Sequence, residues 1–223
     1  MHRGFNRSRF VLLAAAAVTG AGCSTAVRSS SSAGSATATA SAPGAGNAMR
    51  PRDVHPADAH FMSGMIPHHA QAVLIAGWAP SHGARSDVQI LCERIVVAQR
   101  DEISLMQTWL RDRRQPVPDA KATHMKMMMN GMEHDMLMPG MLNDEELARL
   151  DKARGSEFDR LFLNAMIRHH QGAITMVDEL FATAGAGQDE TVFRFASDVY
   201  ADQTTEIERM QKMLATIPGS PGR

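Results

Sequence analysis

Cysteine, aromatic residues and net charge are all scarce in this chain. Its 223 residues include two Cys, eight Phe, two Trp and one Tyr, and the formal net charge at pH 7 is −1. Two cysteines cannot form a disulfide framework; if Cys23 carries a modification, Cys92 is the only remaining thiol and is expected to be a small buried apolar residue. Because no basic face appears along the chain, we expect no nucleic-acid partner.

Sequence patterns that mark common catalytic sites are also missing. No Glu-x-x-His occurs, which excludes the di-iron site of ferritin-type oxidases, and no Cys-x-x-Cys-His occurs, which excludes covalently attached haem. Haem held noncovalently by His and Met stays open. The chain also lacks a Gly-rich phosphate loop, G-x-S-x-G and H-E-x-x-H. We therefore expect a protein that is not an enzyme.

The N-terminus has the pattern of an export signal. Three arginines precede an apolar run from Phe10 to Val18, which is too short to span a bilayer because a span needs roughly 20 residues. The small residues before Cys23 resemble a bacterial lipoprotein processing site. We expect lipid attachment at Cys23 and a chain anchored to the outer face of the cytoplasmic membrane. Cleavage without lipidation, giving a secreted or periplasmic protein, is the alternative.

Composition divides the chain into three parts. Residues 1–22 form the expected signal peptide, and residues 23–52 are a Ser-, Ala-, Gly- and Thr-rich segment that cannot bury enough apolar surface to fold, so we expect a flexible tether. Residues 53–217 remain for one domain, and this length is ample for a packed core.

The domain is built from an internal repeat. Residues Asp58, Phe61, Met65, Ile66, His68 and His69 match Asp159, Phe162, Met166, Ile167, His169 and His170 at a constant offset of 101. Residues Gln99, Glu102, Ile103, Met106 and Leu110 match Gln203, Glu206, Ile207, Met210 and Leu214 at an offset of 104. Each half of the domain therefore contains the same two segments in the same order.

Apolar residues recur with helical spacing in all four segments. Gly and Pro break the chain between the two segments of each half, which predicts helical hairpins over residues 57–112 and 156–216. We predict an all-α fold, an antiparallel four-helix bundle with a pseudo-two-fold axis. The connection, residues 113–155, contains Asn143-x-x-Glu146, a capping-box pattern that predicts one short extra helix from Asp144 to Ala153.

Methionine is unusually abundant, with seventeen residues in the chain. Eighteen consecutive residues of the connection hold eight Met and two His, namely His124, Met125, Met127, Met128, Met129, Met132, His134, Met136, Met138 and Met141. Thioether sulfur is soft and suits Cu(I) and Ag(I), and imidazole adds a borderline donor. These residues are candidate metal ligands. The alternative is a hydrophobic flap over the helices, made of flexible side chains.

The two His-His segments are the second candidate site. Met and His four residues apart share a helix face, so sulfur and nitrogen can converge on one ion. The candidate ligands are Met62, Met65, His68, His69, Met166, His169 and His170, with Gln99, Glu102, Gln203 and Glu206 as groups that orient the imidazoles. The alternative is a symmetric polar network that sets the helix register.

Several of these segments together resemble a known bacterial family. They are Phe162-x-x-x-Met-Ile-Arg-His-His-Gln-Gly-Ala, Met65-Ile-Pro-His-His-Ala, the two Gln-x-x-Glu-Ile-x-x-Met segments and Met-Pro-Gly-Met in the connection. They are similar to the domain of unknown function 305 family, from about Asp58 to Leu214. The resemblance implies an exported, ferritin-like helical bundle, and some members bind copper or silver through Met and His and support copper resistance. It extends to Met65, His68, His69, Met166, His169, His170 and the Met of the connection.

Two functions follow as hypotheses. The first is extracytoplasmic capture of a soft metal, Cu(I) with Ag(I) as its surrogate, with transfer to a periplasmic or surface metal-handling protein. The second is a protein-interaction module that needs no metal and uses the Met-rich connection as an adaptable apolar surface. No organic cofactor is expected under either hypothesis.

Overall fold

The computed structural model describes residues 54–217. The expected signal peptide, tether and lipidated Cys23 lie outside the described residues. In chain order the elements are α1 (Pro56–Ala76), α2 (Ser86–Asp112), β1 (Met125–Met129), β2 (Met132–Met136), α3 (Asp144–Lys152), α4 (Gly155–Ala182) and α5 (Glu190–Ala215). Within this part of the chain, no helix combines the length and hydrophobicity needed to cross a membrane.

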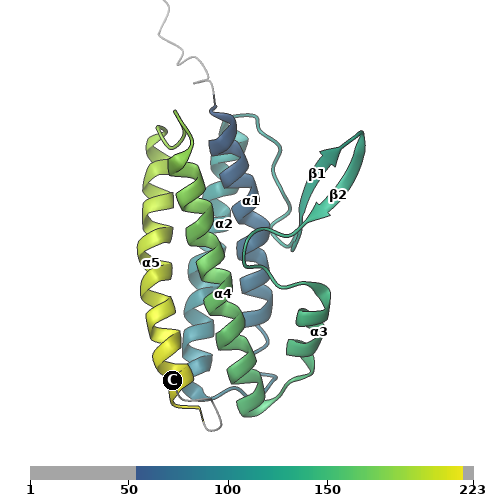
Figure 1. The fold of residues 1–223 in the computed structure, drawn as a ribbon, viewed down its shortest axis with the longest axis vertical. Helices are drawn as coiled ribbons and strands as arrows, with labels where there is room; N and C mark the ends of the chain where they lie inside the picture. The colour runs from purple at the N-terminus through teal and green to yellow at the C-terminus, as the bar shows by residue number, and fades with distance from the viewer. Residues whose placement is uncertain (1–53, 218–223) are drawn as a thin grey trace, which may run out of the picture. The chain divides into compact units, whose positions relative to one another are not determined.

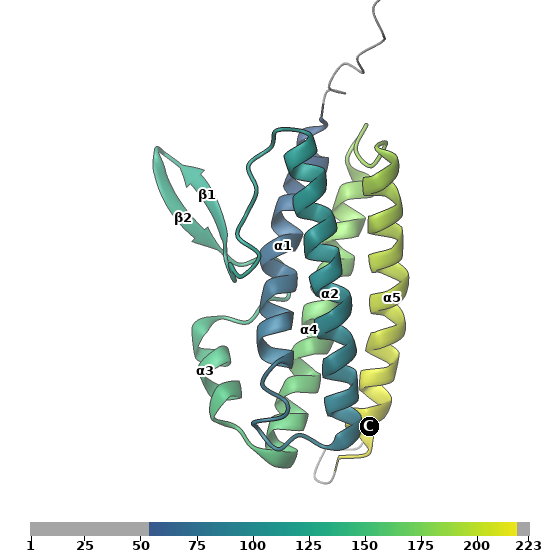
Figure 2. The same ribbon diagram turned by 180° about the vertical axis from the view of Figure 1, so that it is seen from behind.

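The expectation of a mostly helical protein is confirmed. The four long helices lie side by side, and α1 packs against α2 as α4 packs against α5 (Figures 1 and 2). Contacts between α1 and α4 join the two hairpins. Buried apolar residues form two clusters, which include Phe61 and Phe195 in one and Phe158 and Phe162 in the other. The short helix α3 begins with the capping box predicted at Asn143 and Glu146.

The connection departs from the all-α prediction, which is wrong at this point. Met125–Met129 and Met132–Met136 pair as an antiparallel hairpin around Asn130 and Gly131. Both turn residues have positive φ, 53° and 77°, as a type I′ turn requires, and Asn-Gly is the dipeptide that favours this turn. The turn dipeptide was visible in the sequence, whereas the Met-rich strands carry no strong β pattern of their own.

Two aspartates at matched positions of the repeat connect the two helical hairpins, α1–α2 and α4–α5. Asp58 on α1 accepts a hydrogen bond from the backbone N–H of Gly187, in the loop between α4 and α5, at 2.7 Å. Asp159 on α4 accepts from the backbone N–H of Arg85, in the loop between α1 and α2, at 3.2 and 3.3 Å. Each half therefore uses the same residue to hold the loop of the other half.

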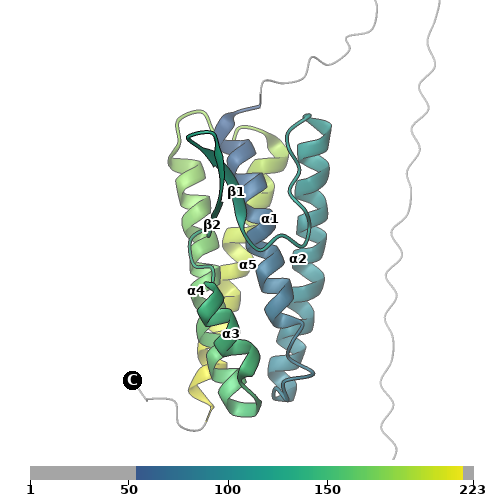
Figure 3. The ribbon, with the colours of Figure 1, turned by 90° about the vertical axis from the view of Figure 1, so that its right-hand side faces the viewer.

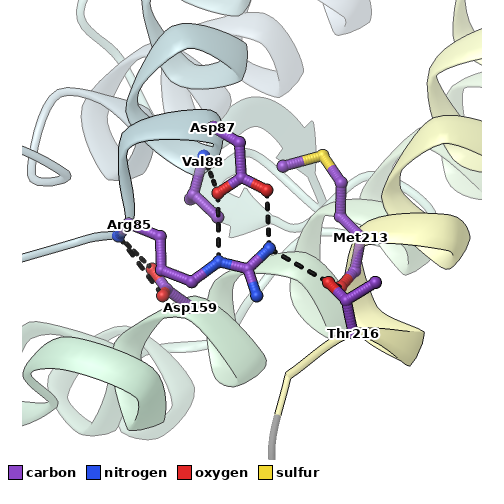
Figure 4. A network of polar contacts seen from close by, with 6 residues as sticks. All are labelled: Arg85, Asp87, Val88, Asp159, Met213 and Thr216. Carbon is purple, nitrogen blue, oxygen red and sulfur yellow. Dashed lines mark hydrogen bonds and ion pairs between the residues drawn. The ribbon is translucent and has the colours of Figure 1, made fainter.

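The Arg85 side chain extends the second of these contacts (Figure 4). Its guanidinium pairs with Asp87 at 2.6 Å and donates to the Thr216 hydroxyl at 3.1 Å, which ties the start of α2 to the end of α5. The Asp87 pairing raises the pKa of Arg85 and lowers the pKa of Asp87, so both groups are charged at neutral pH.

A duplicated histidine layer and its Met-rich cover

Four histidines meet inside the helices. His68 and His69 on α1 and His169 and His170 on α4 are all fully buried. The His68 and His169 rings lie next to each other across the α1–α4 contact, with their centroids 3.8 Å apart and their planes tilted by 39°. His69 and His170 lie farther out. The ring centroid of His69 is 6.1 Å from that of His68, and the ring centroid of His170 is 6.4 Å from that of His169. The repeat therefore places two equivalent His-His pairs in one polar layer.

Each outer histidine faces a glutamate from the next helix. His170 Nε2 lies 2.8 Å from Glu206 Oε2 in a hydrogen bond. His69 Nε2 lies 2.7 Å from Glu102 Oε2, but this contact is off the hydrogen-bond direction. These are the two glutamates that the sequence placed next to the imidazoles. The matched contacts show that both halves build the layer in the same way.

The layer holds many buried polar atoms without a partner. Within residues 54–217, eight buried side-chain nitrogen and oxygen atoms lack a hydrogen bond, and all belong to the four histidines, Gln99 and Gln203. Leaving a buried polar group unpaired costs about 1–3 kcal/mol. Such a concentration of open donors and acceptors in one layer is the environment in which a bound ion or ordered water satisfies the protein.

The inner histidines are neutral. Burial, reinforced by the charge of His69, lowers the pKa of His68 to about 3, and burial together with His68 places the pKa of His169 well below its usual value. His68 Nε2 lies 3.1 Å from the carbonyl oxygen of Pro139, which can only accept, so Nε2 carries the proton. The unpartnered Nδ1 of His68 therefore presents a lone pair, which is the form in which imidazole binds a metal.

The segment Met138–Leu142 covers the layer on the α1–α4 side. Pro139 contacts His68 through its carbonyl, and the Gln71 side chain exchanges two hydrogen bonds with the backbone of Leu142, at 2.9 and 2.7 Å. On the other side, the carbonyl of Pro139 lies directly against Gly172 of α4. The connection thus folds back onto the middle of the helices, and the loop and the His pairs form one continuous region.

The two halves of the repeat differ at a few matched positions, and these differences allow the single segment Met138–Leu142 to pack against both α1 and α4. Gln71 forms a hydrogen bond with the Met138–Leu142 segment. The matched position in α4 is Gly172, whose missing side chain leaves room for the same segment. Pro67 is matched by Arg168, whose guanidinium pairs with Glu146 of α3 at 2.6 and 2.8 Å. This pairing lowers the pKa of Glu146. The second half of the repeat therefore contacts α3, while the first half binds the Met138–Leu142 segment that follows the β-hairpin.

Two methionine sulfurs meet at Gly64 of α1. A methyl group at Gly64 would lie 3.4 Å from Met138 Sδ and 3.5 Å from Met125 Sδ. The repeat has Ala165 at the matching position of α4. Three further candidate ligands, Met62, Met65 and Met166, are fully buried. A role for Gly64 was not predicted from the sequence. Two features pointed to it: it lies between Met62 and Met65, and the second half has a larger residue at the matching position.

Apart from Met141, the remaining Met and His of the connection whose side chains the structure describes are exposed or half-buried. Met128 and Met132 on the hairpin are 70% and 63% exposed, and Met136 and His134 are also exposed. Met127 and His124 are half-buried, and His124 Nε2 lies 3.9 Å from Asp144 Oδ1. Met141 is buried, and its sulfur accepts a hydrogen bond from the Met138 N–H at 3.2 Å. Figure 3 shows the hairpin and α3 in front of α1 and α4, with α5 behind them. The predicted ligands therefore divide into an inner and an outer set.

No closed site of harder ligands accompanies the sulfurs. Among residues 54–217, no three His, Cys, Asp or Glu side chains gather in a way that would hold a metal ion. Cys92 is buried, and burial raises its pKa to about 12, so it is a protonated thiol packed in the core, as expected from the sequence.

Fold and site together define a helical protein with a duplicated polar core and a methionine-rich cover. The chain belongs to the family described as Domain of unknown function (DUF305), whose model matches residues 58–214. None of the curated proteins matches the chain significantly.

Solved structures agree with this assignment. A secreted protein of the family from Streptomyces coelicolor is 25% identical with a TM-score of 0.61, covering 75% of this chain and 97% of its own. A fragment from Deinococcus radiodurans is 27% identical with a TM-score of 0.60, covering 73% and 97%. CopM in its Cu(I)-bound form is 26% identical with a TM-score of 0.55, covering 73% and 98%, and CopM is also solved bound to Cu(II) and to Ag.

Proposed function

We propose that this protein binds a soft metal ion, Cu(I) or Ag(I), outside the cytoplasm. The observation that carries the proposal is the meeting of the Met125 and Met138 sulfurs at Gly64, beside a buried histidine layer full of unpartnered atoms. Neutral sulfur and neutral imidazole suit Cu(I) and Ag(I) and bind hard cations poorly. The metal-bound structures of CopM support the same chemistry in this family.

In this proposal the four long helices act as a ferritin-like bundle that holds the ligands, and the protein is a binding protein rather than an enzyme. Met125 and Met138 are the principal ligands, and His68, whose Nδ1 has no hydrogen-bond partner, would supply the nitrogen ligand. Lipid attachment at Cys23 would keep the metal at the outer face of the membrane, where a metal-handling protein could receive it. Sequestration of copper is the role that follows.

The ligand assignment is tested by titrating the purified chain with Ag(I). Replacing Met125 and Met138 by Leu keeps the volume of both side chains and removes both sulfurs, so we expect at least a tenfold loss in affinity. Replacing the exposed Met128 and Met132 by Leu is the matched control, and we expect the tightest site to be unchanged. Equal affinity in wild type and M125L/M138L would remove Met125 and Met138 from the site.

Gly64→Ala provides a second test that leaves every ligand in place. The new methyl group would lie 2.8 Å from Met138 Cε, so the flexible Met138 side chain must move. Alanine is favoured over glycine inside a helix by roughly 0.5–1 kcal/mol, which offsets the strain. We expect a several-fold loss in Ag(I) affinity with a free energy of unfolding close to that of wild type. Unchanged affinity would show that the sulfurs over Gly64 do not bind the metal.

The exposed methionines of the hairpin favour a second candidate, an apolar surface for a partner protein. Met128 and Met132 are mostly exposed, and flexible thioethers adapt to different partners. Thermal unfolding separates the two functions, because an ion that binds only the folded state must raise the melting temperature. A melting temperature independent of Ag(I) would favour the interaction module.

A further inference from the structure

The β-hairpin carries a second group of soft donors, which the sulfur pair over Gly64 leaves unused. Strands β1 and β2 stand beside α1, outside the four long helices (Figures 1 and 2). In their antiparallel register Met127 lies directly opposite His134, and Met125 lies directly opposite Met136. Successive side chains of a strand point to opposite faces, so these four residues share one face of the hairpin. Strand pairing therefore brings together donors from two separate stretches of the chain.

Three of these donors lie within reach of one ion. The Cβ atoms of a directly opposite pair, such as Met127 and His134, are about 4.5–5.5 Å apart. Met136 is two residues from His134 on the same strand, about 7 Å away. It is also the diagonal neighbour of Met127, at about 7–8 Å, a separation that long side chains bridge. The Met125 sulfur is already placed over Gly64, so it belongs to the inner site.

Packing does not account for this face of the hairpin. Met136 is 38% exposed, His134 is exposed and Met127 is half-buried, so none of the three belongs to the apolar core. In the part of the chain that the structure describes, the His134 ring has no hydrogen bond or ion pair. The opposite face is polar, with Lys126 paired to Glu133 at 2.6 Å. A two-stranded hairpin is marginally stable by itself, and methionine does not favour strands, so folding alone gives no reason for the soft face.

We propose that Met127, His134 and Met136 form a second site for Cu(I) or Ag(I), separate from the pair Met125 and Met138. The identity of the ion rests on the proposed function, because thioether and imidazole are the same soft donor set. Exposed side chains lose more rotamer freedom when they bind, so this site is the weaker of the two. Met125 pairs with Met136 through the backbone while its sulfur reaches Gly64, so an ion captured on the hairpin lies next to the inner site.

Calorimetric titration of the purified chain with Ag(I) should give two bound equivalents, one tight and one weaker. Replacing Met127 and Met136 by Leu keeps the volume of both side chains and removes two of the three ligands, so we expect the weaker Kd to rise at least tenfold. Met128→Leu removes a sulfur from the opposite face and should change neither Kd. The ring nitrogen chemical shifts of His134, whose signals H134Q identifies, should move with the second equivalent only.

Gly131→Ala tests the strand pairing while every ligand stays in place. Gly131 has a φ of 77°, which alanine disfavours, and the added methyl group would meet nothing within 4 Å. The substitution therefore loosens the turn without a new contact. We expect the weaker Kd to rise several-fold and the tight Kd to stay the same.

The hairpin site and the inner site fail in different ways. M125L/M138L should lose the tight equivalent and keep the weaker one, whereas loss of both would show a single shared site. One equivalent in wild type, or an unchanged weaker Kd in M127L/M136L or in G131A, would overturn the hairpin site alone. Absence of any Ag(I) binding by wild type would overturn both proposals. Thermal unfolding in a chelator establishes that each variant is folded.

Discussion

Replacing Gly172 by Ala should destabilise the protein by about 2–3 kcal/mol, because a Cβ at this position would overlap the backbone carbonyl of Pro139. Backbone cannot move aside as a flexible side chain can, so the whole Met138–Leu142 segment must lift from α4. An ordinary glycine inside a helix gives the opposite sign, since alanine there stabilises by roughly 0.5–1 kcal/mol. A loss of stability in G172A, rather than a gain, would therefore indicate that Gly172 packs against the Pro139 carbonyl.

Chemical denaturation of the metal-free chain measures this effect. Gln171→Ala, at the neighbouring exposed position of α4, is the matched control and should change the free energy of unfolding by less than about 0.5 kcal/mol. Because the displaced segment includes Met138 and the Pro139 carbonyl on His68, we also expect G172A to lose Ag(I) affinity. A G172A protein as stable as wild type would mean that the segment is not seated between α1 and α4.

Acidification should unfold the metal-free protein through its inner histidines. Burial holds the pKa of His68 at about 3 and the pKa of His169 well below 6.5, so the folded state keeps both rings neutral while the unfolded state protonates them. Stability is therefore complete above pH 6.5 and falls as the pH decreases towards 3. Each such histidine contributes a limiting slope of about 1.4 kcal/mol per pH unit.

Denaturation curves between pH 7 and pH 4.5, recorded with a chelator, test this expectation. His169→Gln removes one of the two titrating rings and should reduce the slope by about half. His60→Gln removes an exposed histidine and should leave the slope unchanged. A wild-type free energy of unfolding that is constant across this range would show that the rings are not buried as neutral groups.

Local patterns in the sequence predicted the helical elements well. The spacing of apolar residues placed the four long helices, and Asn143 with Glu146 placed the short one. The hairpin was missed because its Asn-Gly turn lies among methionines, which have no marked preference for strands. Once formed, its register puts Met125, Met127, Met132, His134 and Met136 on one face, a grouping that follows from pairing and not from spacing along the chain.

The sequence by itself determined that this is a mostly helical protein, and it identified the His-His pairs and the Met-rich connection as candidate metal ligands. An offset of about one hundred residues is visible without coordinates, and so are the residue types that suit a soft metal. Only the tertiary structure decided which of those residues meet. Long-range contacts such as Pro139 with His68, and the sulfurs of Met125 and Met138 over Gly64, depend on how α1 and α4 pack and on the space left at Gly172. Such contacts join segments about seventy residues apart, so no local period encodes them, whereas a helix face is set by neighbours three and four residues away.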